Sequence, residues 1–139
     1  GIYLADRIHQ ELKHLQPQSE LQAGNLDITF FRDDFRTNKD LPAASATAID
    51  FIIEDKNVIL VDDVLWTGRT IRAALDALLA FGRPRKVELV VLVDRRFSRQ
   101  LPIEPNYIGI EVDSVDSQKV VVSWKETDQQ DRVTLLLDK

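Results

Sequence analysis

The sequence has no cysteine and no methionine, and what it lacks narrows the classes of protein that it can encode. Without cysteine, neither a disulfide framework nor a thiolate metal site can form. No apolar run approaches the roughly 18–20 residues that a membrane-spanning helix needs, and no signal-peptide pattern opens the chain. Lysine and arginine number 18 against 23 aspartates and glutamates, which gives a net charge of −5. Nucleic-acid binding would therefore need a local basic cluster.

With 139 residues the chain has the length of one domain, and its 44% hydrophobic and 29% charged residues are typical of globular proteins. The absence of cysteine fits a reducing cytoplasm. The chain begins at Gly1 and runs directly into a helical pattern with no capping residue before it. Without methionine it also has no initiator residue. We therefore expect a single domain over residues 1–139, truncated at its N-terminus, in a cytoplasmic protein.

The spacing of apolar residues predicts alternating helices and strands. Helices are expected over residues 2–15 and 70–81, the second ending at Gly82. Strands are expected over residues 26–31, 49–53, 58–61, 87–93, 107–111, 120–124 and 133–137. The continuous apolar runs 58–61 and 87–93 are typical of strands buried in a parallel sheet. The fold class is therefore α/β, with one open, mostly parallel twisted sheet flanked by helices. Residues 32–47 read as a long loop, which in a compact domain is more often functional than idle.

The chemistry concentrates in residues 58–70, Val-Ile-Leu-Val-Asp-Asp-Val-Leu-Trp-Thr-Gly-Arg-Thr. Asp62 and Asp63 follow a buried strand, where ligands of open α/β sheets bind. In the turn 67–70, Gly68 allows close backbone approach, and free N–H groups at the helix start favour a phosphate. Carboxylates repel phosphate but accept hydrogen bonds from sugar hydroxyls or hold a metal through water. Each part alone is often only a strand end or a helix start. Together they predict a site for a ribose 5′-phosphate.

This segment resembles the phosphoribosyl pyrophosphate (PRPP) motif of type I phosphoribosyltransferases. Within that superfamily the chain is similar to the bifunctional pyrimidine-operon regulators and uracil phosphoribosyltransferases. Three further stretches carry the narrower likeness: residues 27–34, 92–95 and 101–109. The likeness covers nearly all of the chain and implies the type I phosphoribosyltransferase fold, with the family's N-terminal strand and helix missing. The family's pyrophosphate loop, of Lys-Thr-Arg-Gly type, would be present only as its last residue, Gly1. Weak or absent turnover is expected without the rest of that loop.

The resemblance also implies roles for individual residues. The catalytic residues would be Asp62 and Asp63, which hold the ribose hydroxyls, and Arg32, which closes over the site with the loop that follows it. The implied contacts to PRPP and the nucleotide are Asp62, Asp63, Val64, Leu65, Trp66, Thr67, Gly68, Arg69 and Thr70. The base would be framed by Arg95 and Val120. Mg²⁺ would be bound through PRPP near the two aspartates, with no direct protein ligand.

The residue at position 66 bears on which base is bound. Hypoxanthine-guanine enzymes of the superfamily carry an aspartate there for proton transfer, whereas the pyrimidine regulators carry an aromatic residue, as Trp66 is here. Trp66 could also be only a packing lid on the turn. The resemblance implies that uracil displaces pyrophosphate from PRPP to give uridine monophosphate (UMP), in a homo-oligomer (dimer or tetramer) without membrane contact. Purine and orotate enzymes are disfavoured.

A second hypothesis is a binding protein that senses uridine nucleotides and attenuates transcription on a pyrimidine-leader RNA, with little or no catalysis. The local concentration of positive charge consists of Arg83, Arg85, Lys86, Arg95, Arg96 and Arg99. Short clusters of this kind are usually solvated surface. Residues 95–99 also depart from the family's pattern and are one residue longer. Turnover and RNA affinity would distinguish the two hypotheses.

Overall fold

The structure is a computed structural model that describes residues 1–28 and 49–137. Its elements, in chain order, are α1 (Ile2–Leu15), β1 (Asn57–Leu65), α2 (Arg69–Leu79), β2 (Lys86–Arg96), β3 (Tyr107–Asp113), β4 (Lys119–Ser123), α3 (Lys125–Asp128) and β5 (Arg132–Leu136). Strands β1, β2 and β3 form a parallel sheet in that order, and β4 pairs with β5 in an antiparallel hairpin. No described helix is long and apolar enough to cross a membrane.

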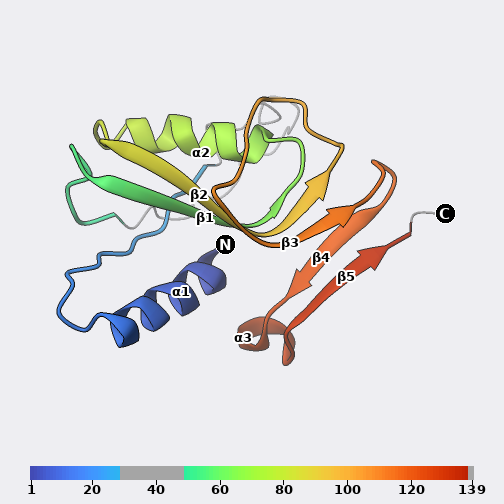
Figure 1. The fold of residues 1–139 in the computed structure, drawn as a ribbon, viewed down its shortest axis with the longest axis horizontal. Helices are drawn as coiled ribbons and strands as arrows, with labels where there is room; N and C mark the ends of the chain where they lie inside the picture. Colours follow the sequence, from blue (N-terminus) through green and yellow to red (C-terminus); the bar gives the residue numbers. More distant parts are fainter. Residues whose placement is uncertain (29–48, 138–139) are drawn as a thin grey trace, which may run out of the picture.

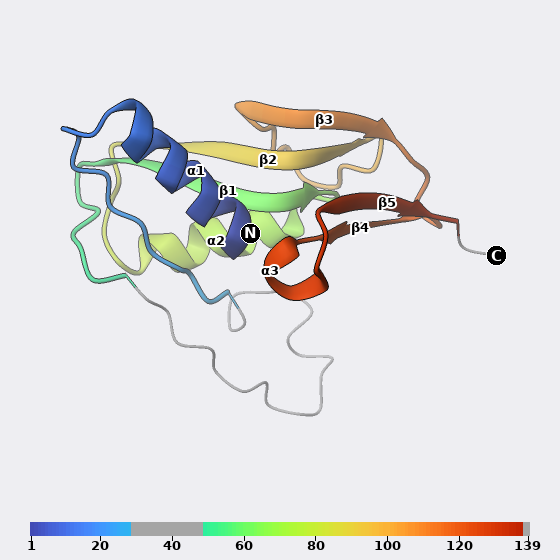
Figure 2. The ribbon, with the colours of Figure 1, turned by 90° about the horizontal axis from the view of Figure 1, so that it is seen from below.

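The sheet is covered on both faces by helices, which confirms the predicted α/β class. Figure 1 shows α2 on one face, whereas α1 and α3 lie on the other side of the sheet. Figure 2, turned by 90°, shows α1 crossing in front of β1 and the β4–β5 hairpin beside the far end of that strand. The predicted strands 120–124 and 133–137 correspond to this hairpin, which stands apart from the parallel sheet.

The hydrophobic core lies between the sheet and α2. Its buried side chains come from the end of β1, the first turn of α2 and the middle of β2: Leu65, Ile71, Leu89 and Val91. Half-buried side chains pack against them: Leu60, Leu75 and Ile103. Each large apolar side chain that leaves water contributes about 1.5–3 kcal/mol to the free energy of unfolding. This packing fixes the turn between β1 and α2, because residues on both sides of that turn belong to the core.

The predicted strand over residues 49–53 is wrong, because the described chain is irregular there. Its apolar run instead supplies one anchor: Ile53 is buried, while its neighbour Ile52 is exposed. The following residues hydrogen-bond the chain after α2, with Asp55 N donating to Arg83 O at 2.9 Å and Arg83 N donating to Glu54 Oε2 at 2.6 Å. The carbonyl of Ile53 accepts from Lys56 N at 3.0 Å, so the end of this segment is engaged in a turn and not in a sheet.

Two further differences concern short segments. Of the strand predicted over 26–31, residues 26–28 are not in a strand, and 29–31 lie outside the described residues. The sequence also did not predict α3, a single turn that begins where β4 ends. Four residues are too few for a helical period to be read from the spacing of apolar side chains.

Candidate active site

The two adjacent aspartates lie inside β1, which continues to Leu65 beyond the predicted end of the strand. Neighbouring side chains of a strand point to opposite faces, so Asp62 and Asp63 cannot share one orientation. Asp62 Oδ1 accepts a hydrogen bond from Asp63 N at 2.8 Å. Burial is the main cause that raises the pKa of Asp62 above its ordinary value, and this hydrogen bond opposes the rise. Asp62 is thus a partly desolvated acceptor at the carboxyl end of the sheet.

Asp63 is held from two sides. Its Oδ2 accepts a hydrogen bond from the indole Nε1 of Trp124 at 3.3 Å. Its Oδ1 is buried and has no hydrogen-bond partner, and the nitrogen of Gly1 lies 3.5 Å from it. A Cβ added to Gly1 would stand 2.5 Å from Val61 O, so only glycine can approach β1 this closely. The structure therefore brings Gly1 next to both predicted catalytic carboxylates.

The turn after β1 has the conformation that the motif predicts. Gly68 is the N-cap of α2 with φ 94°, a left-handed value that side chains rarely adopt. A Cβ there would lie 3.1 Å from Ile103 Cγ1. The carbonyl of Thr67 accepts hydrogen bonds from Gln100 N at 2.9 Å and Leu101 N at 3.1 Å. Residues 100–103 therefore hold the turn in place. Helix α2 starts at this end of the sheet, so the positive end of its dipole lies next to the turn.

Trp66 and Arg95 form a stacked pair beside this turn. The Arg95 guanidinium carbon lies 4.8 Å from the centroid of the Trp66 ring, which is 41% exposed. Arg95 itself is buried: its Nε donates to Ser114 Oγ at 2.9 Å. Its Nη2 donates to the carbonyls of Val115 (3.0 Å) and Gln118 (2.8 Å). Arg95 thus fixes the Trp66 ring and the segment before β4 at the same time.

The remaining predicted site residues lie further from Asp62 and Asp63 or fall outside the described residues. Val120 is half-buried in β4, in register with Leu135, and belongs to the hairpin that contacts β1 through Trp124. Thr70 is exposed in the first turn of α2. Arg32 lies outside the described residues. Within residues 1–28 and 49–137, no group of three or more carboxylate or imidazole side chains gathers to hold a metal.

Sequence reasoning missed the residues that support Asp63. Trp124, Arg7 and Asp131 come from the end of β4, from α1 and from the turn before β5. They meet only in the folded chain, because Arg7 and Asp131 are separated by 124 positions. No motif spacing could have indicated them.

Comparison with known proteins agrees with this geometry. Residues 1–127 match the family model described as a phosphoribosyl transferase domain. The chain belongs to the phosphoribosyltransferase family. More narrowly, it is 47% identical over 135 residues to the bifunctional protein PyrR of Desulfosudis oleivorans. The alignment covers 97% of this chain and 74% of that protein. Identity to the bifunctional protein PyrR of Endomicrobium trichonymphae is 48% over 139 residues, covering 98% and 77%. The resemblance predicted from the sequence is confirmed.

The fold is also similar to a solved structure. A hypoxanthine phosphoribosyltransferase of Trypanosoma cruzi aligns with a TM-score of 0.51 and 21% identity, over 67% of this chain and 53% of that chain. At this identity the likeness shows the fold alone, and it agrees with the parallel sheet of β1, β2 and β3.

Proposed function

We propose that this chain is a uracil phosphoribosyltransferase that also takes part in regulating pyrimidine gene expression. The reaction transfers the phosphoribosyl group of PRPP to N1 of uracil and gives UMP and pyrophosphate. One observation carries the proposal: in a member of the phosphoribosyltransferase family, two carboxylates lie near the carboxyl end of a sheet strand, and a left-handed Gly68 then opens a helix at the same edge.

The carboxylates suit the ribose and the turn suits its phosphate. Asp62 and Asp63 would accept hydrogen bonds from the ribose hydroxyls, since an ionised carboxylate is an acceptor with several lone pairs. The turn 67–70 would bind the 5′-phosphate through N–H groups and hydroxyls at the positive end of the α2 dipole. Val64 and Leu65 would fix the turn through the strand and the core. The C1′–oxygen bond to pyrophosphate breaks as the bond from C1′ to uracil N1 forms; the pyrophosphate keeps the electron pair, and the proton of uracil N1 is released to water.

Mg²⁺ fits this site as an ion that enters with PRPP. The donor set next to the turn consists of carboxylates, and carboxylate oxygens and water are the ligands that Mg²⁺ prefers. Asp62 and Asp63 would hold the ion through water and ribose oxygens. When bound, it would neutralise charge on the leaving pyrophosphate. The close packing of Gly1 on β1 supports its predicted place at the end of the pyrophosphate loop. Arg32 stays a prediction.

The base would lie between the Trp66–Arg95 pair and β4. The half-exposed indole of Trp66 offers a flat apolar surface, and its contact with Arg95 prevents it from rotating freely. An indole cannot transfer a proton to a purine ring nitrogen as a carboxylate can. Val120 would contribute the apolar side of the base site. This arrangement supports uracil over hypoxanthine or guanine.

The basic cluster gives little support to a protein that only binds RNA. Arg96 pairs with Asp113 at 2.6 Å, Arg85 with Asp55 at 3.1 Å, and Arg99 with Asp94 at 2.8 Å. Arginines that are paired within the chain have less charge to offer to phosphates. RNA binding therefore rests on the bifunctional relatives and not on this cluster.

Product analysis tests the proposal. The chain, extended ahead of Gly1 by the Lys-Thr-Arg residues of the family's pyrophosphate loop, is incubated with PRPP, Mg²⁺ and labelled uracil, and we expect labelled UMP and pyrophosphate in equal amounts. Replacing Asp63 by asparagine should slow the reaction more than 100-fold, on the order of the loss seen when a transition-state contact is removed. Labelled uracil recovered unchanged after long incubation would contradict the enzyme. A gel shift with a pyrimidine-leader RNA hairpin then decides whether the chain is a sensor.

A further inference from the structure

Asp63 is connected to α1 by a set of contacts that the proposed reaction does not itself use. Trp124 follows β4 and is buried, with 8% of its surface exposed. Its indole nitrogen donates to Asp63 Oδ2 across 61 positions of sequence. To bind a ribose hydroxyl, the carboxylate of Asp63 must be oriented. The strand backbone does not do this, because it leaves the side-chain torsions free.

The backbone of Trp124 is fixed independently of its ring. Trp124 N donates to Asp128 Oδ2 at 2.9 Å, and the carbonyl of Trp124 accepts from Thr127 N at 3.1 Å and Asp128 N at 2.7 Å. These bonds close the single turn of α3 on itself. The backbone of Trp124, from which the indole extends, is therefore held by the turn independently of the contact with Asp63.

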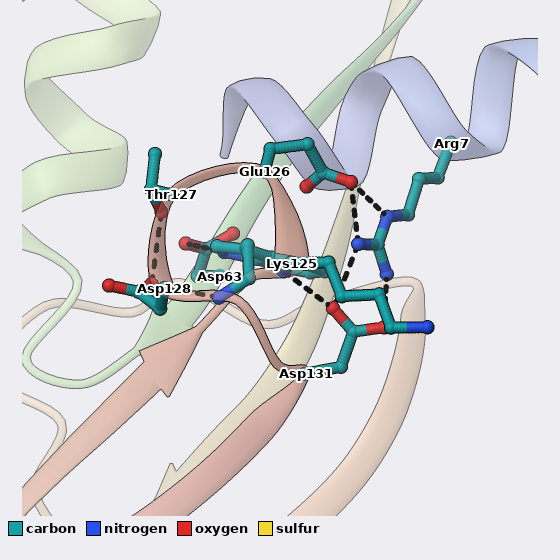
Figure 3. A network of polar contacts seen from close by, with 8 residues as sticks. Arg7, Asp63, Lys125, Glu126, Thr127, Asp128 and Asp131 are labelled. Atoms are coloured by element: carbon teal, nitrogen blue, oxygen red, sulfur yellow. Dashed lines mark hydrogen bonds and ion pairs between the residues drawn. The ribbon is translucent and has the colours of Figure 1, made fainter.

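The ring of Trp124 is held from its outer side by Arg7 of α1. The Arg7 guanidinium carbon lies 4.8 Å from the indole centroid. Two nitrogens of the same guanidinium bond both oxygens of Asp131, at 3.0 and 2.8 Å, and two bond Glu126 Oε1, at 3.2 and 2.7 Å. Figure 3 shows Arg7 reaching from α1 to Glu126, which lies in α3, and to Asp131, which follows α3. Asp131 Oδ1 also accepts from Lys125 N at 2.9 Å.

The pKa of Asp131 is lowered from its ordinary value by these contacts. The hydrogen bond from Arg7 is the largest cause that lowers it, to about 2. A planar guanidinium bound by two carboxylates has little freedom left, so its position over the indole is specified. The chain of contacts runs from α1 through Arg7 and Trp124 to Asp63.

We propose that Trp124 is a positioning residue for Asp63, and that Arg7, with Glu126 and Asp131, holds it in place. This inference rests on the proposed function, in which Asp63 accepts a ribose hydroxyl of PRPP. The indole N–H occupies Oδ2 and fixes the plane of the carboxylate. Outer contacts that orient the groups touching a ligand commonly contribute tenfold or more to affinity or activity.

The decisive variant is Trp124→Phe, which removes the N–H donor and keeps an aromatic ring under Arg7. We expect kcat/KM for PRPP to fall about tenfold, the effect of losing one hydrogen bond to a charged group. KM for uracil should stay within about twofold, because the base does not contact Asp63. If Trp124 only packed, Trp124→Phe would lower the melting temperature without affecting PRPP more than uracil.

Arg7→Gln and Arg85→Gln form a matched pair of tests. Both arginines bind an aspartate through two nitrogens at the surface, but only Arg7 contacts Trp124. Arg7→Gln should lower kcat/KM for PRPP several-fold, and Arg85→Gln should leave it unchanged. Equal effects of the two variants would overturn the proposal.

A spectroscopic measurement covers the case in which Trp124→Phe does not fold. The indole N–H resonance of Trp124 in the ¹⁵N-labelled protein should move in Asp63→Ala, while that of Trp66 stays in place. An unmoved Trp124 resonance would refute the contact. If the unmodified protein neither binds nor consumes PRPP, the proposed function fails; if it does both and Trp124→Phe is as active, only the positioning role fails.

Discussion

Replacing Gly68 by alanine should damage stability and PRPP binding together. At φ 94° an added Cβ has a cost of about 1–2 kcal/mol. The Cβ would also stand 3.1 Å from Ile103 Cγ1, a branched side chain packed on the core, so that a few tenths of a kcal/mol more is expected. The free energy of unfolding should therefore fall by roughly 2 kcal/mol, and the melting temperature by about 6 °C for a domain of this size.

Gly82 supplies a control for the same substitution away from the site. It has φ 145°, and its added Cβ would lie 3.0 Å from Glu54 Oε2 and 3.2 Å from Ile53 Cγ1. Gly82→Ala should lower the melting temperature in thermal unfolding to a similar degree and leave KM for PRPP unchanged. Gly68→Ala should raise that KM about tenfold or more, because it moves the turn that binds the phosphate. If Gly68→Ala kept normal PRPP affinity with the same loss of stability, the turn would not be the phosphate site.

Three further predictions concern charged groups. Burial raises the pKa of Asp62, so its ionisation is less favourable in the folded chain than in the unfolded chain. The contribution of this group to the free energy of unfolding therefore falls as the pH rises above the ordinary pKa of an aspartate. Asp62→Asn should therefore raise the melting temperature at pH 7 while lowering activity; a lower melting temperature would contradict this. Asp131 has the opposite shift, to about 2, so its stabilisation is present above pH about 4 and lost as the pH falls toward 2. Urea unfolding of Asp131→Asn should show a smaller loss of stability across that interval than the unmodified protein. Asp94→Asn breaks the buried pair with Arg99 at 2.8 Å and should lower the free energy of unfolding by about 3 kcal/mol. A loss below about 1 kcal/mol, measured by urea unfolding, would show that the pair is effectively solvated.

The sequence predicted the elements whose signals are local. The bounds of α1 match the prediction, and α2 begins one residue earlier and ends two residues earlier than expected. The continuous apolar runs of β1 and β2 pair in a parallel sheet as expected. In β2, Leu89, Val91 and Val93 are buried, whereas the run of β1 is only partly buried and its Ile59 is 49% exposed. The same local signals gave a wrong strand at residues 49–53. The apolar residue Ile53 is buried there, but the segment around it is irregular.

The site could be predicted only in its contiguous part. Asp62, Asp63 and Gly68 lie in one short segment whose residue types specify both a backbone conformation and a chemistry. The contacts of Arg95 with Ser114 and of Trp124 with Asp63 depend on how separate segments pack, over 19 and 61 positions. Pairings of this kind are decided by tertiary geometry, which residue spacing does not contain.

The most direct test of the central claim is pyrophosphate release from PRPP and Mg²⁺ by the chain extended ahead of Gly1 with the family's pyrophosphate loop, with uracil, hypoxanthine, guanine or orotate supplied in parallel. We expect release with uracil and a rate at least about 100-fold lower with each of the other bases, because the site lacks the proton-transfer group that the purines need and is predicted to be selective against orotate. Comparable release with hypoxanthine or guanine would contradict the interpretation of Trp66. PRPP that stays intact with every base would contradict the assignment of the Asp62–Thr70 segment as a catalytic site.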